Sequence, residues 1–272
     1  MDVNPRLLTL RFQRYQLKLA IVFTFFFTLG ALVASAEPPK GTLVIVGAGS
    51  PEGLCRKVID LSGKTNANVL VIPFASGLHA LGTKVIKQWR EAGVVQVSAP
   101  SADDATAALA AIRAADVIWF TGGGQAGLMK VLRQLNLVEA IRERYAQGAI
   151  IGGASAGAAV MSKVMMLSHK PKTSDEPQPT GEGLGLWPEV IVDVHFSQRK
   201  HLPRLQSAVA THPDLIGVGI DEDTYAVLRG KKAEVFGQGT VTLVDAREGK
   251  TKLKVRVLKA GARFDLAAST SN

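Results

Sequence analysis

Short runs of consecutive apolar residues alternate along this chain with longer amphipathic stretches. From residue 41 onward, runs with the length and branched composition of buried strands lie at 42–46, 69–73, 94–97, 117–120 and 149–151. Stretches with apolar residues at helical spacing lie at 52–61, 80–91, 103–114, 125–135 and 137–145. Apolar strands interleaved with helices are typical of a parallel sheet covered on both faces. The pattern predicts an α/β fold, a three-layer sandwich around a mostly parallel sheet.

The second half of the chain changes its pattern. A polar stretch at 170–182 contains three prolines and no periodicity, which indicates a surface loop. Strands are predicted beyond it near 190–194 and 216–220, with a helix near 200–210 between them. Residues 225–257 then alternate with a period of two between glycine turns, which predicts antiparallel strands that extend the sheet. No internal repeat or second domain is evident, so we expect a single domain over residues 37–272.

Residues 1–36 have the features of an export signal rather than of a folded element. An uncharged apolar run at 19–33 leads to the small residues Ala34-Ser35-Ala36, and it follows four basic residues: Arg6, Arg11, Arg14 and Lys18. We therefore expect cleavage after Ala36 and a secreted or periplasmic protein that begins at Glu37. An uncleaved membrane anchor is the alternative, because about 18 uncharged residues approach a spanning length.

Composition narrows the partners and cofactors. The chain has 272 residues, 47% of them apolar, which suffices for a large core. The net charge is +9, and basic residues are concentrated late in the chain. Because no nucleic-acid motif accompanies them, a solvated surface is favoured over a binding site for polyanions. Cys55 is the only cysteine, so no intrachain disulfide can form. No histidine has metal-ligand spacing with nearby carboxylates, and we expect neither metal nor cofactor.

Glycine-rich clusters follow several predicted strands at their carboxyl ends, where open α/β sheets bind ligands. The cluster at 47–53 has its third glycine one position too late for a dinucleotide loop, and the second strand ends without a ribose-binding carboxylate. A tight turn explains it. The cluster Thr121-Gly122-Gly123-Gly124-Gln125 leaves backbone N–H groups free to donate. It is either a simple turn or half of an oxyanion hole, with Gln125 contacting substrate.

A third cluster, Gly153-Ala154-Ser155-Ala156-Gly157, has the pattern of a nucleophile elbow. A predicted strand enters it, and residues 156–161 can form the helix that leaves it. The serine of such an elbow has a strained backbone that needs small neighbours, and each neighbour here is glycine or alanine. The helix start would place the Ala156 N–H beside Ser155. We expect the N–H groups of Gly123 and Ala156 to hold an oxyanion.

A serine hydroxyl becomes a good nucleophile only when a base removes its proton. His195 follows Asp193 at the end of one predicted strand, and Glu222 follows the next strand. Both are therefore expected at the sheet edge that carries Ser155. Taken alone, His195 reads equally as a structural histidine, and residues 221–223 as a solvated acidic turn. The order Ser, His, Glu differs from the order in α/β-hydrolases, which argues against the common lipase arrangement.

Four motifs resemble the cyanophycinase family of serine exopeptidases: GGGQ at 122–125, GASAGA at 153–158, DVHFSQR at 193–199 and GIDEDT at 219–224. The resemblance spans residues 41–230. It implies a class I glutamine amidotransferase-like fold, with Ser155 as nucleophile, His195 as base and Glu222 as its orienting carboxylate. It also implies a homodimer, and it implies that the substrate pocket is lined by Gln125, Asp193, Arg199 and Arg204.

The resemblance implies a substrate as well, because cyanophycinases cleave a polyaspartate backbone that carries arginine side chains. Arginines in the pocket suit such a substrate, since guanidinium pairs with carboxylate through two hydrogen bonds. Three residues depart from the cyanophycin-cleaving members: Val194 stands in place of Gln, His201 in place of Arg, and Gly124 in place of Asp. These departures leave the substrate open between cyanophycin and other aspartyl peptides.

The residues together predict a secreted serine exopeptidase that acts on acidic or β-aspartyl peptides. A different class, a secreted binding protein that keeps the elbow for structural reasons, would account for Val194 and His201. An amidase or esterase is the alternative within the hydrolases. Ammonia transfer is disfavoured, because the related glutamine amidotransferases need cysteine where Ser155 stands.

Overall fold

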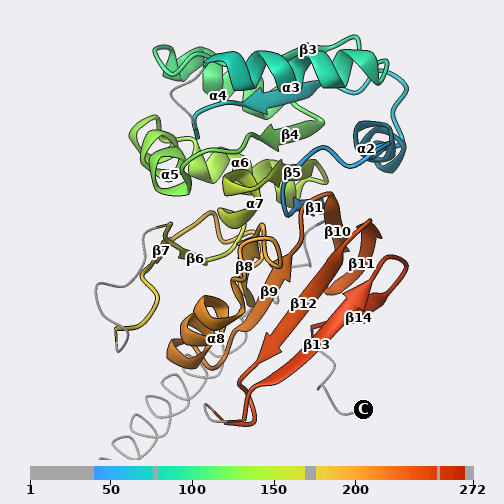
Figure 1. Ribbon diagram of the computed structural model, residues 1–272. Helices are drawn as coiled ribbons and strands as arrows, with labels where there is room; N and C mark the ends of the chain where they lie inside the picture. Colours follow the sequence, from blue (N-terminus) through green and yellow to red (C-terminus); the bar gives the residue numbers. More distant parts are fainter. Residues whose placement is uncertain (1–39, 76–78, 169–175, 250–251, 267–272) are drawn as a thin grey trace, which may run out of the picture. The chain divides into compact units, whose positions relative to one another are not determined.

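Residues 42–154 form the parallel part of the larger sheet, which runs from β1 (Thr42–Val46) to the edge strand β3 (Val97–Ser98) (Figure 1). The computed structural model describes residues 40–75, 79–168, 176–249 and 252–266, and the predicted signal at 1–36 lies outside them. Five parallel strands pair in the order β1, β5, β4, β2, β3, with bounds Thr42–Val46, Ile150–Ala154, Val117–Phe120, Val69–Ile72 and Val97–Ser98. Three antiparallel strands extend it beyond β1: β10 (Thr224–Arg229), β11 (Lys232–Gly237) and β14 (Arg263–Asp265).

Helices cover both faces of this sheet, as the apolar pattern predicts. Within the described residues, these helices are α2 (Leu54–Ser62), α3 (His79–Glu91), α4 (Ala105–Ala114), α5 (Gln125–Gln134), α6 (Val138–Ala146) and α7 (Ala156–Ala159). A later helix, α8 (Leu202–Thr211), packs instead on a second sheet. Alternate residues of β1 point to opposite faces: Val44 and Val46 pack with α2 and α3, whereas Leu43 and Ile45 pack with α4 to α7. The α/β sandwich with antiparallel strands late in the chain is therefore confirmed.

A second sheet carries the strands that precede His195 and Glu222. Its strands, in order, are β13 (Lys254–Lys259), β12 (Thr240–Asp245), β9 (Ile216–Ile220) and β8 (Val190–Val194). The expectation that the strands of residues 225–257 all extend the first sheet is wrong for β12 and β13, which belong to the second sheet. The second sheet packs Val192, Val218 and Leu243 into the same apolar core as Ile45 of the first sheet. Two sheets sharing one core bring the ends of β5, β8 and β9 to a common edge.

The stretch predicted as a surface loop at 170–182 also needs a correction. Thr180–Glu182 forms strand β7, which pairs with β6 (Val164–Met166) in a small antiparallel sheet. Residues 169–175 lie outside the described residues. The alternation there is too short to predict a strand, because each strand has three residues.

Candidate active site

Ser155 lies in a strained turn between β5 and α7. Its φ of 54° and ψ of −117° lie in a region that residues with a side chain rarely adopt. A Cβ atom on Gly153 would come within 2.7 Å of the Gly157 backbone, and one on Gly157 within 2.3 Å of the Phe120 carbonyl oxygen. These close approaches explain why both flanking positions are glycine. The turn has the geometry that the sequence predicts, although α7 is shorter than the predicted 156–161.

Three side chains from three separate turns form one hydrogen-bonded chain. The Ser155 Oγ lies 2.9 Å from the His195 Nε2, and the His195 Nδ1 lies 2.5 Å from the Glu222 Oε1. An imidazole protonated at Nδ1 donates to the carboxylate and leaves Nε2 free to accept the serine proton. The His195 side chain is 15% exposed and that of Glu222 is 42% exposed, so the chain is open to solvent at its carboxylate end.

The loop after β1 fixes the relative positions of these three turns. Consecutive carbonyl oxygens accept one hydrogen bond from each: Val46 from the Ser155 N–H at 3.1 Å, Gly47 from the His195 N–H at 3.3 Å, and Ala48 from the Asp223 N–H at 2.9 Å. The sequence predicts only a tight turn at 47–53 and gives no sign that its carbonyl groups position the three turns. Hydrogen bonds accepted by backbone carbonyls leave no signal in the residue types that make them.

Asp221 and Gln198 tie the His195 turn to the Glu222 turn. The buried Asp221 carboxylate accepts the Ser197 N–H at 2.9 Å and the Thr240 N–H at 2.9 Å. Burial acts to raise the pKa of Asp221, but these donors outweigh it and hold the pKa below its ordinary value. The Gln198 Oε1 accepts the Glu222 N–H at 3.1 Å. The acidic run 221–223 therefore contains a buried structural carboxylate beside the one that meets His195.

The backbone N–H groups of Gly123 and Ala156 are the donors predicted to form an oxyanion hole. The N–H of Ala156 begins helix α7 and so has no acceptor within the helix. Gly123 has a φ of 140°, and Gly122 lies so close to the serine that a Cβ there would be 4.0 Å from Oγ. Among the described residues, neither Gly123 nor Ala156 donates its backbone N–H to an acceptor. Both donors are available to a negatively charged oxygen.

The predicted pocket residues Asp193 and Arg204 are engaged with each other. Asp193 is 1% exposed, and the Arg204 guanidinium donates to both of its oxygens, with Nε 2.9 Å from Oδ2. The His201 Nδ1 lies 3.3 Å from the Asp193 Oδ1. Burial acts to raise the pKa of Asp193, but the hydrogen bonds from Arg204 and His201 lower it overall. Two of the five N–H donors of the Arg204 guanidinium are therefore directed inward, and its charge is paired with Asp193.

Gln125 and Arg199 differ in their surroundings. The Gln125 amide donates to the Met166 carbonyl at 3.0 Å and accepts the Ser168 hydroxyl at 2.9 Å, which fastens the start of α5 to the end of β6. Arg199 is exposed, and its guanidinium makes no hydrogen bond or ion pair with the part of the chain that the structure describes. Of the four predicted pocket residues, Arg199 alone keeps its charge free.

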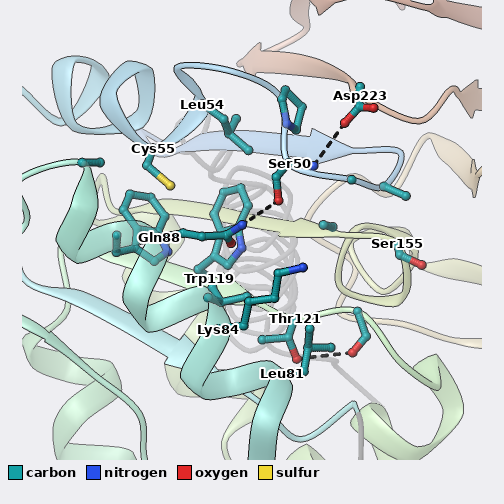
Figure 2. Close-up of a pocket in the computed structure, with 18 of the residues that line it drawn as sticks. Ser50, Leu54, Cys55, Leu81, Lys84, Gln88, Trp119, Thr121, Ser155 and Asp223 are labelled. Atoms are coloured by element: carbon teal, nitrogen blue, oxygen red, sulfur yellow. Dashed lines mark hydrogen bonds between the residues drawn. The ribbon is translucent and has the colours of Figure 1, made fainter.

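A cleft of about 880 Å³ opens beside Ser155 on the α2 and α3 face of the sheet (Figure 2). Ser155, His195 and Gly122 are among the residues that line it. The Trp119 and Trp89 rings, packed edge to face at 5.4 Å, contribute to its apolar lining. Helix α3 contributes to this cleft, although no motif in the sequence marks that contribution.

Cys55 also lines the cleft but does not have the properties of a nucleophile. Burial raises the pKa of its thiol to about 11, so the thiol stays protonated near neutral pH. No group of three or more His, Cys, Asp or Glu side chains in the described ranges is arranged to hold a metal ion. No helix in those same ranges combines the length and apolar character needed to cross a bilayer.

The serine of the elbow is hydrogen-bonded to a histidine on an α/β sandwich, and two nearby backbone N–H groups are free to donate. These features are typical of a serine hydrolase. Residues 43–236 match the family model of Peptidase family S51. A cyanophycinase of Trichormus variabilis is 34% identical over 265 residues, which cover 86% of this chain and 88% of that protein. The chain belongs to peptidase family S51 and is a serine-type peptidase, as the sequence motifs predict.

Two further comparisons agree with this assignment. The chain is similar to Peptidase E of Pasteurella multocida, at 28% identity over 195 residues that cover 68% of this chain and 80% of that protein. The structure also superposes on the crystal structure of a peptidase from an acI-B1 Actinobacterium, with a TM-score of 0.63 and 25% sequence identity. The superposition covers 83% of this chain and 97% of the other protein's chain. The resemblance to the cyanophycinase family is confirmed.

Proposed function

We propose that this chain is an exported serine exopeptidase that hydrolyses aspartyl or β-aspartyl bonds in acidic peptides, with Ser155, His195 and Glu222 as its catalytic residues. The observation that carries the proposal is the continuous hydrogen-bonded chain from the Ser155 Oγ through His195 to Glu222. Relatives named cyanophycinase and Peptidase E support the substrate class. The assembled triad also favours an enzyme over a binding protein that keeps the elbow for structural reasons.

The geometry supports an acyl-transfer mechanism. The His195 Nε2 removes the Ser155 proton as the oxygen attacks the scissile carbonyl carbon, and Glu222 stabilises the imidazolium that results. The N–H groups of Gly123 and Ala156 donate to the oxyanion of the tetrahedral intermediate. His195 then passes its proton to the leaving amine, and an acyl-enzyme ester remains on Ser155. Water, deprotonated by His195, attacks that ester and restores the serine.

A substrate screen tests this proposal. Purified protein without residues 1–36 would be offered cyanophycin, β-aspartyl dipeptides, N-terminal aspartyl peptides and neutral peptides of matched length. We expect turnover of at least one aspartyl class, at a rate well above that of the neutral peptides. Hydrolysis of neutral peptides alone would contradict the substrate class and leave the serine peptidase assignment in place.

The export part of the proposal is tested separately. It rests on the basic segment, the apolar run at 19–33 and the residues Ala34-Ser35-Ala36. N-terminal sequencing of the protein recovered from outside the cytoplasm should begin at Glu37. Recovery of the chain from the cytoplasm with Met1 intact would contradict export.

A further inference from the structure

Helix α3 contributes a cation to the cleft beside Ser155. Lys84 lines this cleft together with Ser155 and His195. Figure 2 shows the Lys84 side chain leaving α3 with its ammonium group directed into the cleft. Within the described residues, the Lys84 ammonium group makes neither an ion pair nor a hydrogen bond. Its charge is therefore available to a ligand.

The spacing along α3 explains why Lys84 lacks a partner while its neighbour has one. Lys87 meets Glu91 four residues later, with 3.6 Å between the Nζ and Oε1 atoms. The residue four positions after Lys84 is Gln88, which is neutral, and its amide donates to the Ser50 hydroxyl at 2.8 Å. Lys84 therefore faces no carboxylate on its own helix.

The remaining charged groups of the cleft are already engaged. The Asp223 Oδ1 accepts the Ser50 N–H at 3.1 Å, and Figure 2 shows Asp223 on the side of the cleft away from Lys84. Arg56 lies 4.0 Å from Asp60, and Glu91 is the partner of Lys87. Among the described residues that line the cleft, Lys84 thus carries the one unpaired positive charge that a negatively charged ligand group would meet.

We propose that Lys84 is a specificity-determining residue that binds a carboxylate of the peptide substrate in the cleft on the α3 side of Ser155. This inference rests on the proposed function and deepens it. The sequence assigned carboxylate recognition to Arg199 and Arg204, but Arg204 is bonded to Asp193 and neither arginine lines this cleft. The apolar lining around Trp119 lowers the local dielectric, which strengthens a lysine–carboxylate contact at the cleft relative to one in open water.

The test measures binding rather than turnover, so that it does not depend on the proposed reaction. In a Ser155→Ala background, calorimetry would compare peptides that differ only by Asp or Asn at one position. The peptides would be short, and each position next to the scissile bond would be varied in turn. Lys84→Met would be compared with Lys87→Met, which removes a lysine from the same helix but outside the cleft lining.

With Lys84 present, we expect the Asp peptide to bind about three- to thirtyfold more tightly than the Asn peptide at one position. Lys84→Met should remove that preference, and Lys87→Met should keep it. Raising the salt concentration should weaken the preference, because the contact is partly screened. An Asp preference that survives Lys84→Met, or no Asp preference at any position, would overturn the inference. Peptide turnover in the enzyme with Ser155 intact reports on the proposed function independently.

Discussion

The guanidinium of Arg204 and the carboxylate of Asp193 form a two-point ion pair two residues before His195, with the Arg204 Nε 2.9 Å from the Asp193 Oδ2. Asp193 lies in strand β8 of the second sheet, whereas Arg204 lies on α8. The pair thus joins the helix that follows the His195 turn to the strand that precedes it. We infer that Arg204 acts on the site through the position of this turn.

Replacing Arg204 with alanine tests that structural role. The change leaves the buried Asp193 carboxylate without its main donor, and loss of one partner of a buried ion pair costs about 3–5 kcal/mol of folding stability. Arg199→Ala serves as the control, because the exposed Arg199 side chain makes no hydrogen bond or ion pair with the described residues, and such changes cost within about 0.5 kcal/mol. Urea unfolding measures both. Equal stabilities of the two variants would contradict a structural role for Arg204.

The lowered pKa of Asp193 predicts how the folding stability changes at low pH. A carboxyl group whose pKa is lower in the folded protein than in the unfolded chain stabilises the fold fully above its ordinary pKa of 3.8. That stabilisation is lost as the pH falls below this value toward the lower folded pKa. Asp193→Asn should therefore be less stable at pH 6 and should lose less stability between pH 5 and pH 2. Parallel acid-unfolding curves for the two proteins would contradict this expectation.

Gly47 is expected to tolerate no side chain. A Cβ there would lie 2.1 Å from the Asp221 carbonyl oxygen, and the Gly47 carbonyl accepts the His195 N–H. Gly47→Ala should shift the His195 turn, and a displacement of about 1 Å can reduce the rate roughly 100-fold. Gly127→Ala is the matched control, because a Cβ on that residue of α5 meets nothing within 4 Å. Peptide turnover and thermal unfolding of both variants test this, and equal activity would contradict it.

Sequence patterns predict the layers of this fold well, because buried parallel strands and amphipathic helices carry a periodic signal. They also predict the elbow, since the backbone strain at Ser155 demands small neighbours that the sequence shows directly. The division of the late strands between two sheets leaves no such signal, because β9 and β10 belong to different sheets yet are both almost completely buried. Strand partners depend on contacts between residues far apart in the chain, and these contacts were not predictable from local patterns.

The substrate pocket was the least predictable part of the site. Charged residues near His195 in sequence were predicted to contact the substrate. Asp193 and Arg204 instead form an ion pair with each other, and the Asp193 carboxylate is buried. Lys84 lies more than a hundred residues from His195 in sequence and sits on an unremarkable helix. Its place in the cleft follows from the packing of α3 on β2 and β3, which no local pattern reveals.

Glu222 is expected to act through the orientation and charge of His195. Glu222→Gln keeps the shape of the side chain but removes the negative charge that stabilises the imidazolium. The turnover number should fall by about 100- to 10,000-fold, with a small change in KM, since the reacting charge develops only in the transition state. Steady-state kinetics on the peptide identified by the substrate screen measures this. A change in KM alone would assign Glu222 to substrate binding instead.

The most direct test of the account is covalent labelling of Ser155 by a serine-reactive phosphonate. The His195 Nε2 lies 2.9 Å from the Ser155 Oγ, so we expect rapid labelling of one serine, located by mass spectrometry of the digested protein. Ser155→Ala should remove the label and His195→Ala should slow it greatly, while circular dichroism shows that both variants stay folded. A folded wild-type protein that is not labelled, or is labelled equally in Ser155→Ala, would contradict the assignment of Ser155 as the catalytic nucleophile.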